Sequence, residues 1–199
     1  MHLVRDADTV LLDTSVFYRF CDGQQLQALK LYLASRARIS REVARELFVA
    51  PRDGVYRDFE AIRDPPWPKK TGHVPSQFRL DADRLMREAR LVEARQLNID
   101  LADVPAHKHA GEVTTVLMAQ HLHADLVVID DRFGRDLARA RRVPRISTAQ
   151  LCLQMVIDGS LSEEEGFSVF DLSTPPTAGR AEYESALRRA RQAMGSDDD

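Results

Sequence analysis

The stretch Asp8-Thr-Val-Leu-Leu-Asp13-Thr-Ser-Val-Phe17 decides the fold class. Its centre, Val10-Leu11-Leu12, is a short apolar run that favours a buried β-strand. The run ends in three small polar residues, Asp13, Thr14 and Ser15. A buried strand that delivers a carboxylate at its C-terminal end is how open parallel sheets build ligand sites. The alternative is that Asp13 caps the following helix, with Thr14 or Ser15 sharing that role.

Size and composition limit the classes of protein that this chain can be. Its 199 residues, of which 44% are hydrophobic, suffice for one domain with a real core, with or without appendages. No window has the roughly 18 consecutive apolar residues of a membrane span, and the charged N-terminus lacks the apolar core of an export signal. Cys21 and Cys152 have neither metal-site nor disulfide-framework spacing. We therefore expect a cytoplasmic protein with no membrane partner and two reduced thiols.

Hydrophobic periodicity predicts strands that alternate with helices along most of the chain. Such alternation is typical of α/β proteins with a mostly parallel central sheet flanked by helices. The expected strands are 10–12, 37–39, 125–129 and 143–146. The expected helices are 24–36, 41–49, 80–97, 111–123, 132–141 and 148–157, with one or two further helical turns in 56–63.

The chain outside this alternation divides into an insertion and an extension. Residues 64–78 contain four prolines and one glycine, which predicts a loop. Trp67 in this loop either stacks on a nucleobase or pins the loop to the body. We expect one domain over 1–158, with 64–97 as its insertion. Residues 159–199 then form a helical C-terminal extension that ends in a disordered acidic tail.

Acidic residues fall where predicted strands end and along neighbouring helices. One ends the first strand, two end the strand 125–129, one lies in the first turn of the helix 111–123, and two share a face of the helix 41–49. In a parallel sheet, strand ends and helix starts lie along one rim, so these carboxylates could meet. The acids in question are Asp13, Glu42, Glu46, Glu112, Asp130 and Asp131.

A cluster of carboxylates needs neutralising charge, because the groups repel one another. Arginine or lysine, protons, or divalent cations could supply it, and ligation by oxygen alone suits Mg²⁺ or Mn²⁺. Such ions can activate water and stabilise a phosphoryl transition state. They would also let a chain of net charge −3 act on nucleic acid. The structural alternative is that Glu112 is a surface acid favoured by a helix dipole and that Asp130-Asp131 caps a helix. Two apolar strands that both end in aspartate favour the metal site.

The histidines offer a weaker metal signal. His107 and His109 are two residues apart, as are His121 and His123. At this spacing the members of each pair point to opposite sides of a helix. We therefore do not expect a zinc site.

Four motifs together make the chain resemble the PIN-domain nucleases and, within them, the VapC-type toxins of prokaryotic toxin–antitoxin pairs. The resemblance covers residues 8–158, and the first and last motifs are the specific ones. The motifs are Leu11-Leu-Asp13-Thr-Ser-Val16, Ile39-Ser-Arg-Glu-Val-Ala-Arg-Glu46-Leu47, Gly111-Glu112, and Leu126-Val-Val-Ile-Asp130-Asp131-Arg132-Phe-Gly134-Arg135. The resemblance implies a three-layer fold in which helices enclose a parallel sheet. It also implies three or four acids that bind Mg²⁺ or Mn²⁺ and cleave RNA, usually single-stranded.

The resemblance assigns roles residue by residue. The metal ligands would be Asp13, Glu46 rather than Glu42, Glu112, and Asp131 with Asp130 beside it. Thr14 or Ser15 would hold a ligand or a phosphate oxygen. Arg132 and Arg135 either grip flanking phosphates or form surface salt bridges, Arg135 with Asp131 or Asp136.

The expected function is that of a metal-dependent endoribonuclease, with the toxin of a type II toxin–antitoxin pair as one role. The expected partners are RNA, a small antitoxin protein and a second copy of the chain. The insertion replaces a shorter helical hairpin of the family, and residues beyond 160 are not part of a minimal PIN toxin. The alternative is a non-catalytic PIN-like regulatory protein that docks through residues 180–194. A haloacid-type phosphatase is disfavoured, because Asp13-Thr-Ser lacks a second aspartate two residues on.

Overall fold

The computed structural model describes residues 4–48, 67–174 and 179–195. Within these ranges the strands form one sheet in the order β3-β2-β1-β4-β5, and every neighbouring pair is parallel. The strands are β1 (Val10–Leu12), β2 (Ala37–Ile39), β3 (Lys69–Lys70), β4 (Leu126–Val128) and β5 (Arg145–Ile146). This arrangement confirms the α/β class with a parallel central sheet.

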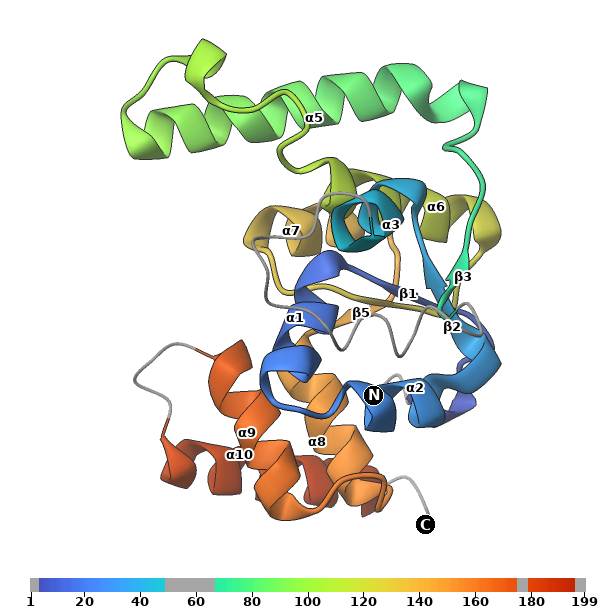
Figure 1. Cartoon of the computed structure of the whole chain (residues 1–199), viewed down its shortest axis with the longest axis vertical. Helices are drawn as coiled ribbons and strands as arrows, with labels where there is room; N and C mark the ends of the chain where they lie inside the picture. The colour runs from blue at the N-terminus through green and yellow to red at the C-terminus, as the bar shows by residue number, and fades with distance from the viewer. Residues whose placement is uncertain (1–3, 49–66, 175–178, 196–199) are drawn as a thin grey trace.

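Helices lie on both faces of the sheet, which gives a three-layer arrangement (Figure 1). Helices α3, α6 and α7 lie on one side with α5 beyond them, and α1, α2, α8, α9 and α10 lie on the other. The helices are α1 (Thr14–Asp22), α2 (Leu26–Leu33), α3 (Arg41–Phe48), α5 (Ser76–Leu97), α6 (Ala110–Leu122), α7 (Arg132–Ala140), α8 (Thr148–Ile157), α9 (Glu163–Ser173) and α10 (Arg180–Gly195). None of the helices in these ranges is long and apolar enough to cross a membrane.

Side chains of the central strands alternate between two hydrophobic cores. Val10 and Leu12 of β1 pack with α1, α2 and α8, whereas Leu11 packs with α5, α6 and α7. In β4, Val128 joins the first core and Val127 the second. A period of two along a strand sends successive side chains to opposite faces. Both faces are covered, so these strands are apolar throughout instead of alternating with polar residues.

Most predicted elements are confirmed within one or two residues, and the strands 10–12 and 37–39 and the helix 148–157 match fully. The predicted helix 24–36 is shorter, because its last turn is the 3₁₀ helix Ala34–Arg36. The loop predicted over 64–78 is wrong in two places. Lys69–Lys70 forms β3, and α5 begins at Ser76 instead of 80. The helical turns predicted for 56–63 and the acidic tail 197–199 lie outside the described residues.

The contacts of Trp67 support the interpretation that this residue pins its loop to the body of the protein. The residue is buried, and its indole Nε1 donates a hydrogen bond to the carbonyl oxygen of Ala34 at 2.6 Å. Its ring meets that of Phe17 edge-on, with 6.1 Å between the centroids. Trp67 therefore fixes the chain that leads into β3.

The C-terminal helices share the core that contains α1 and α8. Val169 and Phe170 of α9 and Tyr183 and Leu187 of α10 are buried in it. Gly166 of α9 lies against α10, since an added Cβ there would be 2.7 Å from the Tyr183 hydroxyl. Helices α9 and α10 thus cover one side of the molecule away from α5 (Figure 1).

The strand order places a change of direction at the centre of the sheet. From β1 the chain proceeds to β2 and β3 on one side, and it then crosses to β4 and β5 on the other. In open α/β sheets, ligands bind beyond the carboxyl ends of the strands at such a switch point. Asp13 and the pair Asp130-Asp131 follow β1 and β4, the two strands that meet there.

Candidate metal centre

Asp13 caps a helix and also lies at the switch point, so both interpretations of its position hold. It is the N-cap of α1, and its Oδ2 accepts hydrogen bonds from the Ser15 hydroxyl at 2.8 Å and the Ser15 backbone N–H at 3.3 Å. The residue is only 3% exposed. Burial and, to a smaller extent, the nearby charge of Glu46 together raise the pKa of Asp13 to about 6, against the lowering effect of its hydrogen bonds from Ser15. A buried carboxylate held in one orientation can serve as a metal ligand.

Glu46 approaches Asp13 from α3. Its Oε2 accepts a hydrogen bond from the Thr14 hydroxyl. A Cβ atom added to Gly111 would lie 3.1 Å from each carboxylate oxygen of Glu46, so the absence of a side chain there admits the carboxylate. Glu42, one turn earlier, instead lines a separate cavity of about 280 Å³ between α3 and α5. The structure therefore places Glu46, and not Glu42, beside Thr14 and Asp13.

Glu112 carries the strongest electrostatic signature of the group. It lies in the first turn of α6, and its side chain is 22% exposed. Burial, followed by the charges of Asp13, Asp131 and Glu46 in that order of effect, raises the pKa of Glu112 to about 8. Carboxylates from three other elements therefore act on Glu112.

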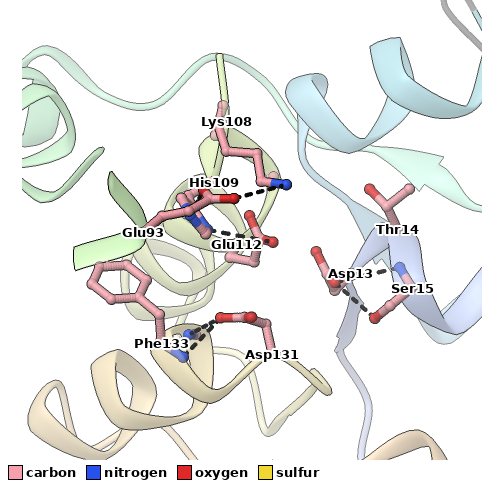
Figure 2. Close-up of polar contacts among 12 residues, drawn as sticks. Asp13, Thr14, Ser15, Glu93, Lys108, His109, Glu112, Asp131 and Phe133 are labelled. Carbon is pink, nitrogen blue, oxygen red and sulfur yellow. Dashed lines mark hydrogen bonds and ion pairs between the residues drawn. The ribbon is translucent and has the colours of Figure 1, made fainter. Parts of the chain in front are cut away.

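Asp131 completes this group as the N-cap of α7. Its Oδ1 accepts from the backbone N–H groups of Phe133 at 2.7 Å and Gly134 at 3.2 Å. Figure 2 shows the carboxylates of Asp13, Glu112 and Asp131 facing one space. The same picture shows that this space lies between the start of α1, the start of α6 and the start of α7.

Asp130 lies outside this group, contrary to its inclusion among the expected ligands. Its Oδ1 accepts a hydrogen bond from the backbone N–H of Thr148 at 2.7 Å, at the start of α8. The Arg135 guanidinium donates to the backbone carbonyl of Asp130. Adjacent residues after a strand point to opposite sides, so Asp131 faces the other carboxylates while Asp130 faces α8.

His109 joins the carboxylates, which the sequence analysis did not anticipate. His109, Glu112 and Asp131 each offer a ligand atom, and these atoms lie within 4.8 Å of one another. The histidine pair 107–109 was placed on a helix, but α6 begins at Ala110 and His109 is its N-cap with φ +66°. The spacing His109-x-x-Glu112 at a helix start is the signal that could have identified it.

The remaining predicted residues surround the group. Thr14 and Ser15 hold the carboxylates of Glu46 and Asp13, as described above. The side chain of Arg132 is 90% exposed and lies 3.9 Å from Asp136. Arg135 supports the turn after β4, so its pairing with Asp131 or Asp136 is replaced by a bond to a backbone carbonyl. Contact of Arg132 or Arg135 with phosphate stays a prediction.

The residues present fit a divalent cation. With no cation bound, the raised pKa values of Asp13 and Glu112 mean that protons neutralise part of the cluster near neutral pH. A divalent ion would replace those protons and satisfy several carboxylate oxygens at once. The imidazole Nδ1 of His109 is buried and has no hydrogen-bond partner among the described residues, so one more donor faces the same space.

Comparison of the chain with family models, with curated proteins and with solved structures found no match. The class is therefore defined by fold and site alone. The chain is an α/β protein with a parallel sheet, and it gathers carboxylates and one histidine at the carboxyl ends of its central strands.

Proposed function

We propose that the chain is a PIN-like endoribonuclease that uses Mg²⁺ or Mn²⁺ to hydrolyse phosphodiester bonds of RNA. The observation that carries this proposal is the gathering of Asp13, Glu112 and Asp131 around one space at the sheet's switch point, where the charges of Asp13, Asp131 and Glu46 all act on Glu112. Carboxylates that crowd one another so closely are typical of sites for hard divalent ions. The order of these acids along the chain is also the order of the family motifs quoted above.

The chain's own residues would divide the work as follows. Asp13, Glu46, Glu112 and Asp131 would hold the metal, which when bound supplies charge stabilisation and an activated water for attack on phosphorus. Ser15 orients the carboxylate of Asp13 and Thr14 orients that of Glu46, so neither must reorganise when the substrate arrives.

Substrate contacts would come from outside the carboxylate group. Arg132, which is highly exposed and follows Asp131 directly, is placed to meet a phosphate next to the scissile bond. Single-stranded RNA is the favoured substrate on the family resemblance. A toxin role with a small antitoxin and a homodimeric assembly belong to the same proposal and rest on that resemblance.

The test is cleavage of labelled single-stranded RNA with Mg²⁺ or Mn²⁺, compared between the natural chain and Asp13→Asn. We expect the variant to lose at least about 100-fold in rate, because it removes a carboxylate charge without changing shape. Glu88→Gln is the control, since Glu88 lies on α5 with 57% of its side chain exposed and belongs neither to the group nor to the residues proposed to contact RNA. Equal cleavage by the natural chain and Asp13→Asn would refute the mechanism. No cleavage by any form would favour the non-catalytic alternative.

A further inference from the structure

We propose that His109 is a nitrogen ligand of the metal centre and that it makes the site select Mn²⁺ over Mg²⁺. The inference rests on the proposed function, because it concerns the ion bound by the same carboxylates. It also assigns a role to α5, the long helix of the insertion.

The imidazole of His109 is held by a carboxylate on its far side. Nε2 lies 2.8 Å from Oε2 of Glu93, which belongs to α5. A carboxylate only accepts hydrogen bonds, so the ring proton of the neutral imidazole lies on Nε2 and donates to Glu93. Nδ1 then carries the lone pair. It lies 3.9 Å from Oε1 of Glu112, on the side of the ring that faces the other acids (Figure 2).

A histidine that donates one nitrogen to a carboxylate and presents the other to an ion is a recurring arrangement in metal sites. The carboxylate partner fixes the tautomer, orients the ring and increases the basicity of the ligating nitrogen. Here the second nitrogen is buried and lacks a hydrogen-bond partner among the described residues, although it faces carboxylates. This unpaired atom is the observation, independent of the acids, that points to a ligand.

The arrangement is built from tertiary contacts that hold the ring in place. The Lys108 ammonium lies 3.4 Å from Oε1 of Glu93, so that carboxylate is fixed from two neighbouring residues (Figure 2). The ring of Phe133 packs against the imidazole with 5.9 Å between centroids. Arg90, one turn before Glu93, donates to the carbonyls of Leu101 at 3.1 Å and Val104 at 2.6 Å. Helix α5 thereby anchors the segment that leads into His109.

Nitrogen ligation changes which ion the site prefers. Mg²⁺ is a hard ion that takes oxygen ligands and retains its waters, whereas first-row transition ions bind imidazole readily. A site of carboxylates alone would discriminate little between Mg²⁺ and Mn²⁺, and one imidazole would favour Mn²⁺. The competing role for His109 is that of a protonated counter-charge to Glu112, which would support both ions equally or neither.

The experiment measures binding of Mn²⁺ and of Mg²⁺ by calorimetry in the absence of RNA. The variant is His109→Asn, because asparagine adopts the left-handed backbone of this position more easily than most residues. The matched control is His123→Asn, at the other end of the same helix. His123 is also left-handed, with φ +51°, but its side chain is exposed and it lies at the opposite end of α6 from Glu112. Far-UV circular dichroism and thermal unfolding show whether each variant folds.

We expect His109→Asn to weaken Mn²⁺ binding by about tenfold or more and to change Mg²⁺ binding by less than about twofold. Electron spin-echo spectra of bound Mn²⁺ should show coupling to a directly bonded ¹⁴N in the natural chain and in His123→Asn. The coupling should be lost in His109→Asn. Glu93→Gln should give an intermediate loss of Mn²⁺ affinity.

Two results would overturn the inference alone. One is an unchanged ratio of Mn²⁺ to Mg²⁺ affinity in His109→Asn, and the other is the absence of nitrogen coupling in the natural chain with Mn²⁺ bound. Failure of the proposed function looks different. In that case the natural chain binds neither ion, or Asp13→Asn binds both as well as the natural chain does.

Discussion

The carboxylate cluster should make the metal-free chain less stable as the pH rises, and Glu112→Gln should remove most of this loss. Glu112 has a pKa of about 8 in the folded chain against 4.5 for its ordinary value. The folded state therefore binds more protons than the unfolded state between these values. Stability falls with rising pH wherever the folded state holds the extra proton. The stabilising contribution of the Glu112 proton is therefore full below about pH 4.5 and is lost as the pH rises through 8.

The size of the effect follows from the shift. At about 1.4 kcal/mol per pKa unit, the whole window corresponds to about 5 kcal/mol as an upper limit. About 2 kcal/mol of this falls between roughly pH 6.5 and 8.5, a range that lies above the pKa of Asp13 at about 6. The Glu112 side chain is 22% exposed, so solvent screens part of the repulsion. We expect a measured loss of about 1–2 kcal/mol over that range.

The assay is urea unfolding in EDTA at several pH values, for the natural chain, for Glu112→Gln and for a control. Glu88→Gln is the control, because Glu88 lies on the exposed side of α5 with 57% of its side chain accessible. The natural chain and Glu88→Gln should lose stability in parallel, whereas Glu112→Gln should stay nearly level. If the free energy of unfolding depended on pH in the same way in all three proteins, the crowding of carboxylates around Glu112 would be refuted.

Three further substitutions test the packing that positions the site, each by urea unfolding. Trp67→Phe removes the hydrogen bond to Ala34 and should lower the free energy of unfolding by about 1 kcal/mol. On the proposed function, RNA affinity should stay within about twofold, and a large loss of affinity would instead favour stacking of Trp67 on a base. Gly134→Ala would place a Cβ 2.2 Å from Cδ1 of the fully buried Ile129, so we expect a net loss of about 1–3 kcal/mol, and a gain would show that α7 has room to move. Tyr183→Phe removes a buried hydroxyl that has no partner among the described residues, and stability should stay level or rise by about 1 kcal/mol. A clear loss would mean that this hydroxyl is hydrogen-bonded.

The secondary-structure elements that could be predicted are those whose own residues carry a clear pattern. Val10–Leu12 ends abruptly in Asp13, and Leu126–Val128 leads to Asp131, so the sequence alone brought two acids to one rim. In contrast, β3 is two lysines that pair with β2 alone among the described strands, and nothing in their local pattern indicates a strand. Helix α5 starts after Pro75, without a side-chain cap that would have marked its first turn.

The site was predictable where a residue's role depends on its own element and not where it depends on a distant one. In the sequence, only the family motif distinguishes Glu46 from Glu42, because both residues share a helix face. The orientation of the His109 ring depends on Glu93, 16 residues earlier, which reaches it from α5. That contact depends on how α5 packs along α6, and periodicity carries no information about it.

The wide separation of the acids along the chain has a consequence for folding. Residues as far apart as Asp13 and Asp131 come together only when β1 pairs with β4, which closes a very long loop. On the proposed function, the unfolded chain would therefore have no preformed affinity for the ion, and binding would stabilise only the completed fold by mass action, by about 2.7 kcal/mol when the ion is at 100 times its dissociation constant. On the proposed function, a cell depleted of the ion would hold a more easily degraded form of the protein, and metal supply would govern its abundance as well as its activity.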